Sequence, residues 1–277
     1  MLKQRVITAV LLLAVLLPAL FYRSPEPFCA VALLFIVGAG WEWARLNGLS
    51  SKVSVFAGAL LGVVLALLWL GIGLPPADGL AWPWLALVWL PLAAFMLHRG
   101  VPGWAPIPRA ARLLTGWCLI GLAWWAMGSA RYVGASMLLS ILVLVWTADI
   151  AAYFGGKAFG RRKLALSISP GKSWEGAVSG AAGVLAVAAL WVYAEQQSWI
   201  AGPSLYGDLW ARGPLLAVLS LLLLTGMSVA GDLIESLVKR SAGVKDSSGL
   251  LPGHGGVLDR VDALLPVLPL AMWLVTL

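Results

Sequence analysis

Long runs of apolar residues, separated by short polar connections, occupy most of the 277-residue chain. A helix needs about 20 mostly apolar residues to cross roughly 30 Å of hydrocarbon, because its backbone must satisfy its own hydrogen bonds there. The pattern therefore predicts an all-α, polytopic membrane protein with about nine transmembrane helices. The nine runs are Gln4 to Tyr22, Pro27 to Ala44, Val53 to Leu74, Trp82 to Leu97, Leu113 to Met127, Tyr132 to Ala152, Glu175 to Ala194, Pro214 to Leu237 and Val257 to Leu277.

The first apolar run has a second interpretation, since a basic start followed by an apolar stretch is also typical of a signal peptide. Lys3 and Arg5 stand at the start of this run, but it lacks a small-residue cleavage site. The second run begins almost at once. We therefore expect the first run to remain as a transmembrane helix.

The composition excludes a water-soluble fold. Hydrophobic residues make up 61% of the chain and charged residues 11%, whereas soluble domains carry roughly 25% charged residues. This number of polar groups is too small to cover the surface of a soluble protein of this length. Most of the apolar side chains must therefore face lipid. Cys29 and Cys118 both lie within apolar runs, which favours a packing role over a disulfide or a metal site.

The distribution of basic residues predicts the orientation, because Lys and Arg are retained on the cytoplasmic side of a membrane. With a cytoplasmic N-terminus and nine spans, 16 of the 19 basic residues fall inside, and only Arg23, Arg131 and Arg212 fall outside. An odd number of spans then places the C-terminus outside. The net charge of +7 is spread between the apolar runs, so it indicates topology and not a nucleic-acid surface.

The acidic residues gather near the predicted cytoplasmic ends of the spans. A carboxylate at membrane depth is costly unless it is paired, so its presence there indicates function. Glu42 lies in such a position on the second predicted span. The other seven are Asp149, Glu175, Asp232, Glu235, Asp246, Asp259 and Asp262.

The spacing of four of these residues places them on two helix faces. Asp232 and Glu235 stand three positions apart, as do Asp259 and Asp262, so each pair shares one face of its helix. An oxygen-rich cluster formed by two such faces suits a hard cation such as Mg2+. The alternative is a structural ion-pair network in which neighbouring basic residues neutralise the carboxylates.

A loop from Gly155 to Gly176 has the composition of a polyphosphate-binding segment. It combines basic residues with glycines, which let backbone amides approach a phosphate, and it ends at the expected N-terminus of a helix. It is not a Walker A loop, because Leu166 stands where that motif requires glycine. The alternative is a basic cytoplasmic loop that follows the orientation rule and binds nothing.

A second loop, from Lys239 to Asp262, carries His254 between glycines. A histidine in such a polar loop could donate a hydrogen bond to a phosphate or orient a metal-bound water. His98 stands alone at the end of the fourth span, and we interpret it as an interfacial residue.

The second loop also carries the most specific motif. Residues 236–262 read SLVKRSAGVKDSSGLLPGHGGVLDRVD, and this segment closely resembles the signature of phosphatidate cytidylyltransferases, also called CDP-diacylglycerol synthases. Residues 149–160 and 169–176 resemble two other recurrent patches of that family. The last patch departs from the family at Gly171, where lysine is expected, and at Ser173, where threonine is common.

The resemblance is specific for residues 149–262, whereas the first 130 residues match only as a hydrophobic profile. We expect residues 1–277 to form one membrane-embedded domain. The family implies that CTP and phosphatidate react to give CDP-diacylglycerol and pyrophosphate, dependent on Mg2+, for phospholipid biosynthesis. It also implies that Asp232 and Asp259 ligate metal, in a site that holds a divalent ion beside a monovalent one such as K+.

The residue pattern and the resemblance together give three sets of candidate residues. The catalytic candidates are Asp232, Asp259, Lys239, Arg240, His254 and Asp246. The candidates for substrate binding are Asp149, Lys157, Ser169, Lys172, Ser173, Glu175, Lys245 and Arg260. The candidate metal ligands are Asp232, Asp259, Asp262 and Glu235.

The expected partners are CTP, phosphatidate and the lipid bilayer, with no nucleic acid and with a homodimer as one candidate assembly. The expected location is the bacterial inner membrane, with the active site facing the cytoplasm. A transporter or channel is an alternative, but it predicts acidic residues spread through the depth of the bilayer, whereas these gather at one face. Another membrane cytidylyltransferase or a CTP-dependent lipid kinase of related architecture is a closer alternative, and assays with other lipid acceptors would discriminate it.

Overall fold

The computed structural model describes residues 2–74 and 82–277 and is 78% helical, which confirms the predicted helical class apart from one small hairpin. The helices are α1 (Leu2–Phe21), α2 (Glu26–Leu46), α3 (Ser51–Ile72), the 3-10 helix η1 (Trp82–Val88), α4 (Trp89–Arg99), the 3-10 helix η2 (Val101–Gly103), α5 (Arg109–Val133), α6 (Ala135–Phe159), α7 (Trp174–Gln196), α8 (Leu205–Arg212), α9 (Pro214–Ser241), α10 (Leu258–Val261) and α11 (Leu264–Thr276). The strands are β1 (Lys163–Ala165) and β2 (Ser169–Ser173).

Seven of the described helices are long and apolar enough to cross a membrane, namely α1, α2, α3, α5, α6, α7 and α9. Each corresponds to one of the predicted runs. The predicted count of nine is not confirmed, because the other two runs do not form long helices. The run from Trp82 to Leu97 is divided into η1 and α4, and the run from Val257 to Leu277 into α10 and α11. The 13 residues of α11 span about 20 Å, less than the thickness of the hydrocarbon layer.

A proline marks the beginning of the last helix in both divided runs. Pro91 lies in the first turn of α4, and Pro266 lies in the first turn of α11. Proline lacks a backbone N–H and clashes with the preceding turn, so it is tolerated in the first turn of a helix and disfavoured in the interior. A hydropathy pattern averages over such positions, and it therefore reads each run as one span.

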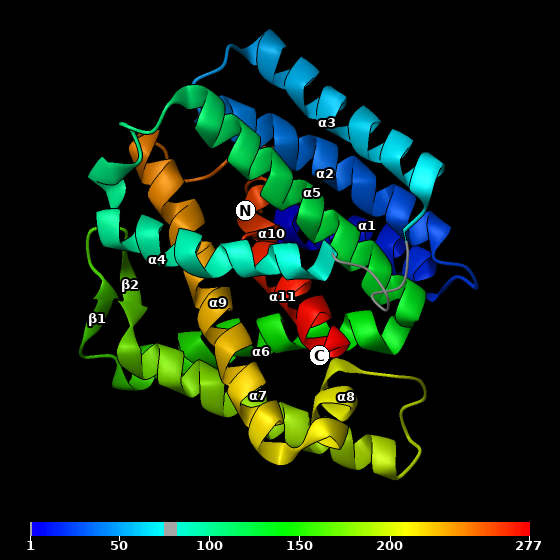
Figure 1. The fold of residues 1–277 in the computed structure, drawn as a ribbon. Coiled ribbons are helices and arrows are strands. Elements are labelled where there is room, and N and C mark those ends of the chain that lie inside the picture. The colour runs from blue at the N-terminus through cyan, green and yellow to red at the C-terminus, as the bar shows by residue number, and fades with distance from the viewer. Residues whose placement is uncertain (1, 75–81) are drawn as a thin grey trace.

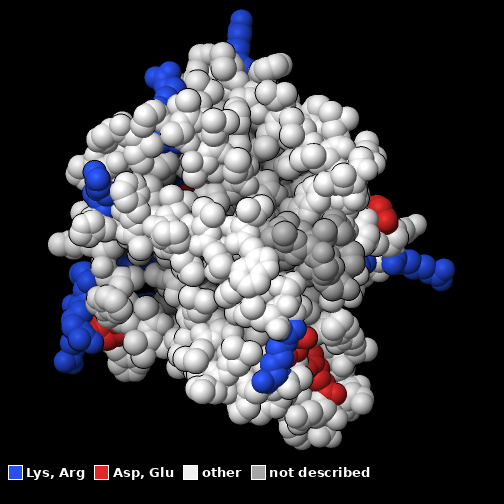
Figure 2. Space-filling model, viewed as in Figure 1, with Lys and Arg blue, Asp and Glu red and all other residues white. Residues whose placement is uncertain are grey.

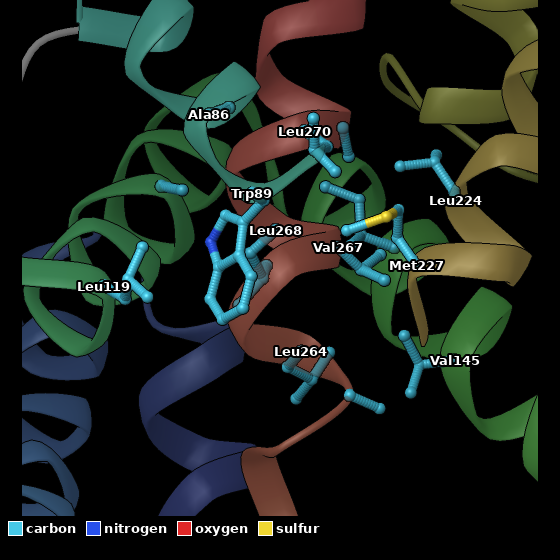
Figure 3. Close-up of a cluster of buried hydrophobic side chains, with 14 of the residues drawn as sticks. Ala86, Trp89, Leu119, Val145, Leu224, Met227, Leu264, Val267, Leu268 and Leu270 are labelled. Carbon is cyan, nitrogen blue, oxygen red and sulfur yellow. The ribbon is translucent and has the colours of Figure 1, made fainter. Parts of the chain in front are cut away.

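The helix α11 runs through the middle of the assembly and is apolar on every face (Figure 1). A helix of this kind must be enclosed. Figure 3 shows Val267, Leu268 and Leu270 of α11 among side chains of neighbouring helices, including Trp89 of α4 and Met227 of α9, and all five are buried. The core of the protein is thus built around α11.

Small residues allow α6 and α7 to cross in close contact. A Cβ added to Gly180 would lie 2.9 Å from the carbonyl oxygen of Ala148, and one added to Gly176 would lie 2.9 Å from that of Ala152. Stripes of small residues of this kind let membrane helices approach closely. Gly156, which we expected in the phosphate-binding loop, belongs to this contact because α6 continues past it. This glycine is therefore helical and packs against the start of α7, and it also lines the cavity between α6, the hairpin and α9.

The segments that carry the predicted site come together in space. Figure 1 shows the N-terminal end of α1 next to α10 and the β1–β2 hairpin next to α9. In Figure 2, which has the same view as Figure 1, the charged side chains of the described residues lie mostly around the rim. This distribution fits a protein whose helices face lipid and whose polar chemistry lies at their ends.

Candidate active site

A cavity of about 470 Å³ lies where α6, β2, the start of α7 and α9 meet. Its wall combines acidic, basic and hydroxyl side chains, and we call it the charged cavity. The structure places six of the predicted site residues in this wall: Asp149, Lys157, Ser169, Lys172, Ser173 and Asp232.

The β1–β2 hairpin carries Lys172 into the charged cavity. Its strands are antiparallel, with Lys163 opposite Ser173. The Nζ of Lys172 lies 2.6 Å from Oδ2 of Asp232 on α9. Ser173 then caps α7, since its Oγ accepts the backbone N–H of Gly176 at 3.1 Å. The ion pair joins the hairpin to α9 across the cavity.

Glu175 is a predicted substrate-binding residue that contacts the hairpin instead of the cavity. Its carboxylate accepts the backbone N–H groups of Arg161 and Arg162, both at 3.1 Å, and the Nε–H of Arg162 at 3.1 Å. It is not among the residues that line the charged cavity. Its contacts fix the chain where it enters the hairpin.

Two further carboxylates lie near Asp232. Gly231 lets the chain before α11 cross α9 closely, because a Cβ added there would lie 2.5 Å from the carbonyl oxygen of Asp262. The Asp262 carboxylate interacts electrostatically with Asp232 and with Lys172. Asp149 on α6 interacts with the same two residues. Three carboxylates therefore share the positive charge of Lys172.

Lys239 joins the end of α9 to the second loop. Its buried ammonium group pairs with Glu235, one turn earlier, and with Oδ1 of Asp259 at 2.6 Å. Oδ2 of Asp259 accepts the N–H and the hydroxyl of Ser247, each at 2.9 Å, and the N–H of Gly256 at 2.7 Å. Burial alone would raise the pKa of Asp259, but the donors from Lys239 and Gly256 hold it at about 2. In this part of the acidic cluster an ion-pair network is observed.

Glu42 of α2 contacts the second loop, although the sequence-based candidate sets omit it. Its side chain is 0% exposed. Oε1 accepts the N–H of Val257 at 2.9 Å and the hydroxyl of Ser248, and Oε2 accepts the N–H of Leu258 at 2.7 Å. Oε2 also lies 3.1 Å from the hydroxyl of Ser247, whose single hydrogen it shares with Asp259. The available signal was an acidic residue between two tryptophans on a predicted span, because a buried carboxylate must find donors.

Comparison with known proteins identifies the family of this chain. Residues 3–277 match the profile of the cytidylyltransferase family. The chain belongs to this family. A protein of Pseudomonas aeruginosa named phosphatidate cytidylyltransferase is 40% identical over 283 aligned residues, which cover 99% of this chain and 97% of the relative. A Haemophilus influenzae protein of the same name is 35% identical, covering 97% and 96%. One of Brucella suis is 42% identical over 163 residues, covering 59% and 53%.

The remaining predicted residues of the second loop are not part of the cavity wall. Arg240, Lys245 and Asp246 are exposed. The Nε of Arg260 donates to the carbonyl oxygen of His254 at 2.8 Å. The Nδ1 of His254 is buried and has no hydrogen-bond partner in the described part of the chain. The roles of these five residues stay predictions.

The donor set around Asp232 fits a hard cation. Among residues 2–74 and 82–277, no three acidic, histidine or cysteine side chains are gathered closely enough to hold a metal as they stand. Asp149, Asp232 and Asp262 nevertheless supply oxygen donors of the kind that Mg2+ prefers, and the cationic Nζ of Lys172 already lies against one of them. Glu235 and Asp259 are different, because the ammonium group of Lys239 already pairs with both carboxylates.

We expect Glu42→Gln to loosen the second loop. An amide retains one acceptor oxygen but presents an NH2 group to the other donors, so the N–H of Val257 or of Leu258 would lose its acceptor. The expected cost is about 1–3 kcal/mol of stability. Measurements are the Tm in detergent and the hydrogen exchange of the peptide covering residues 250–260.

The matched control for this change is Glu26→Gln, which replaces an exposed glutamate at the start of the same helix. It should leave both measurements unchanged. Equal Tm and equal exchange in the two variants would contradict the role given to Glu42.

Proposed function

We propose that the chain transfers a cytidylyl group from CTP to phosphatidate, giving CDP-diacylglycerol and pyrophosphate. The observation that carries this proposal is the likeness, over nearly the whole chain, to relatives named phosphatidate cytidylyltransferase. The charged cavity supports it, since it combines basic and acidic groups at the ends of long apolar helices. A substrate with an anionic head and acyl tails requires such a position.

The chemistry needs charge neutralisation more than proton transfer. The phosphate of phosphatidate is already anionic at neutral pH, so one of its oxygens attacks the α-phosphorus of CTP in line. The new P–O bond forms as the bond to the β-phosphate oxygen breaks, and pyrophosphate leaves. Lys172 and Lys157, both in the cavity wall, are positioned to neutralise the phosphates.

An apolar groove supports a lipid substrate. It has a volume of about 540 Å³, lies against α7 and α9, and shares Leu164, Ala177 and Val229 with the charged cavity. Its other lining residues are mostly apolar and include Trp174 and Leu222. A phosphate group in the charged cavity could therefore keep its acyl chain in this groove, continuous with the bilayer.

For the cofactors, we propose Mg2+ near Asp232, with Asp149 and Asp262 as the neighbouring oxygen donors. A bound divalent ion would supply positive charge to the reacting phosphates. Asp259 and Glu235 remain predicted ligands and would reach a metal only if Lys239 released them. A monovalent cation such as K+, and a homodimer, stay predictions of the family resemblance.

Purified protein should convert labelled CTP and phosphatidate to CDP-diacylglycerol only when Mg2+ is present. Asp232→Asn keeps the side-chain shape and removes the charge, so turnover should fall at least about a hundredfold. Asp208→Asn is the control and should remain active, because Asp208 lies on α8, between the end of α7 and the start of α9 and away from the charged cavity. Full turnover of Asp232→Asn at limiting Mg2+ would exclude the metal assignment. Absence of any product from the unaltered chain would refute the function.

Lys172 is expected to act mainly on CTP. Replacement by Ala removes a charge that we assign to ground-state and transition-state phosphates alike, so the KM for CTP should rise about tenfold with a smaller fall in kcat. Lys163→Ala, an exposed lysine on the same hairpin, is the matched control. An altered KM for phosphatidate alone would instead assign this lysine to the lipid headgroup.

For the location, we propose the bacterial inner membrane, with the hairpin and the second loop on the cytoplasmic side and Leu277 outside. The asymmetry of basic residues supports this orientation. A single cysteine placed at position 166 should resist membrane-impermeant thiol reagents in intact cells, and one placed at position 201 should react, once Cys29 and Cys118 are replaced. The reverse labelling pattern would show that the proposed orientation is wrong.

A further inference from the structure

The inner half of α1 has few packing contacts of its own. Among residues 4–18, all of which the structure describes, only Thr8 is buried. The outer end of α1 is fixed by Arg131, which donates hydrogen bonds to the carbonyl oxygens of Leu20 and Tyr22 at 2.8 and 2.6 Å. These hydrogen bonds explain the position of the outer end, but other contacts are needed to explain that of the inner end.

Two side chains bind the inner end of α1 to the second loop. Thr8 Oγ1 donates to the carbonyl oxygen of Pro252 at 2.9 Å, and Arg5 Nε donates to that of Gly253 at 3.0 Å. The two donors stand three residues apart, so they lie on one face of the helix. They reach two consecutive carbonyl groups almost 250 positions away in the sequence.

The close approach requires a glycine in the loop. Gly253 has a φ of +77°, and a Cβ added there would lie 2.9 Å from Cγ of Arg5 and 3.3 Å from its backbone nitrogen. The loop therefore lies directly against the backbone of α1. Any larger residue would separate the two segments and break the hydrogen bonds.

The carbonyl groups and the N–H groups of the loop have different kinds of partner. The carbonyl groups of residues 252–254 each accept a hydrogen bond from a side chain, the third one from Arg260. The N–H groups of residues 256–258 each donate to a carboxylate, that of Asp259 or Glu42. Side chains on both sides thus fix the orientation of the backbone from residue 252 to residue 258, which contains His254 and leads to Asp259.

We propose that Arg5 and Thr8 are positioning residues of the active site, acting through the carbonyl groups of Pro252 and Gly253. They hold the second loop in the conformation used for cytidylyl transfer. In this view α1 contributes to catalysis as well as to membrane anchoring. The inference rests on the proposed function, so its test includes one measurement that does not depend on activity.

The experiment compares Thr8→Val, which removes the hydroxyl at nearly constant shape, with Thr8→Ser, which restores it. Loss of one hydrogen bond in the loop should lower kcat about three- to tenfold, with the KM for CTP changed less than about twofold. Thr8→Ser should recover most of the loss. Arg5→Gln should act in the same direction, and Ile7→Val and Arg23→Gln are matched controls on the exposed face and at the outer end.

Hydrogen exchange provides the readout that is independent of activity. Peptides covering residues 251–256 should exchange faster in Thr8→Val than in the unaltered protein, while the Tm in detergent changes by less than about 2 °C. Normal kcat in both Thr8→Val and Arg5→Gln would overturn the proposal, as would a loss that Thr8→Ser does not restore. A fall in Tm that accounts for the lost activity would also overturn it, because the role would then be general stability.

Failure of the proposed function would look different. The unaltered chain would then make no CDP-diacylglycerol, and the exchange measurement would still decide whether α1 holds the loop. Unchanged exchange in Thr8→Val would overturn the inference even if the enzyme were fully active.

Discussion

The buried carboxylate of Glu42 determines where the second loop can lie. An ionised carboxylate removed from water is stable only when donors surround it, and all four donors of Glu42 come from residues 247–258. Arg45, one turn later on α2, donates to the carbonyl oxygen of Ser247. One face of α2 thus accepts hydrogen bonds from the loop through Glu42 and donates one to it through Arg45. Asp259 receives its own donors from Ser247 and Gly256 only while the loop stays in this place.

Two lysines form ion pairs in this region that differ in how far they are buried: Lys239 with Asp259, and Lys172 with Asp232 of α9. The side chains of Lys239 and Asp259 are 11% and 7% exposed, so breaking that pair would leave uncompensated buried charge. The side chains of Lys172 and Asp232 are 24% and 32% exposed and open on the charged cavity. Water and incoming phosphates can compete for this second pair at a much lower cost. The pair of Lys172 and Asp232 can therefore open toward the cavity while the pair of Lys239 and Asp259 keeps the loop in place.

Hydropathy predicted most of the fold because the bilayer imposes one requirement on every spanning helix. It predicted the seven long helices but read the segments containing α4 and α11 as whole spans, because average hydropathy does not show where a long α-helix gives way to a 3-10 helix or to two short helices. The position of acidic residues at span ends drew attention to Asp149 and Asp232, and the structure places both in the cavity wall. Spacing could not show that Asp259 faces Lys239, since this depends on how the loop folds back. The role of Glu42 was hidden for the same reason, because its four donors lie more than 200 residues away.

The first 130 residues carry none of the three motif patches, yet they supply several of the side chains that order the motif-bearing loop. Irregular backbone near the end of a membrane helix is stable only where each N–H and C=O finds a partner. The loop has no strand or long helix in which to find them. Several of its partners are instead single side chains near the N-terminal end of α1 and the C-terminal end of α2, among them Arg5, Thr8 and Glu42. The requirement acts on a few donors and acceptors, so segments at opposite ends of the sequence form one polar unit around the loop.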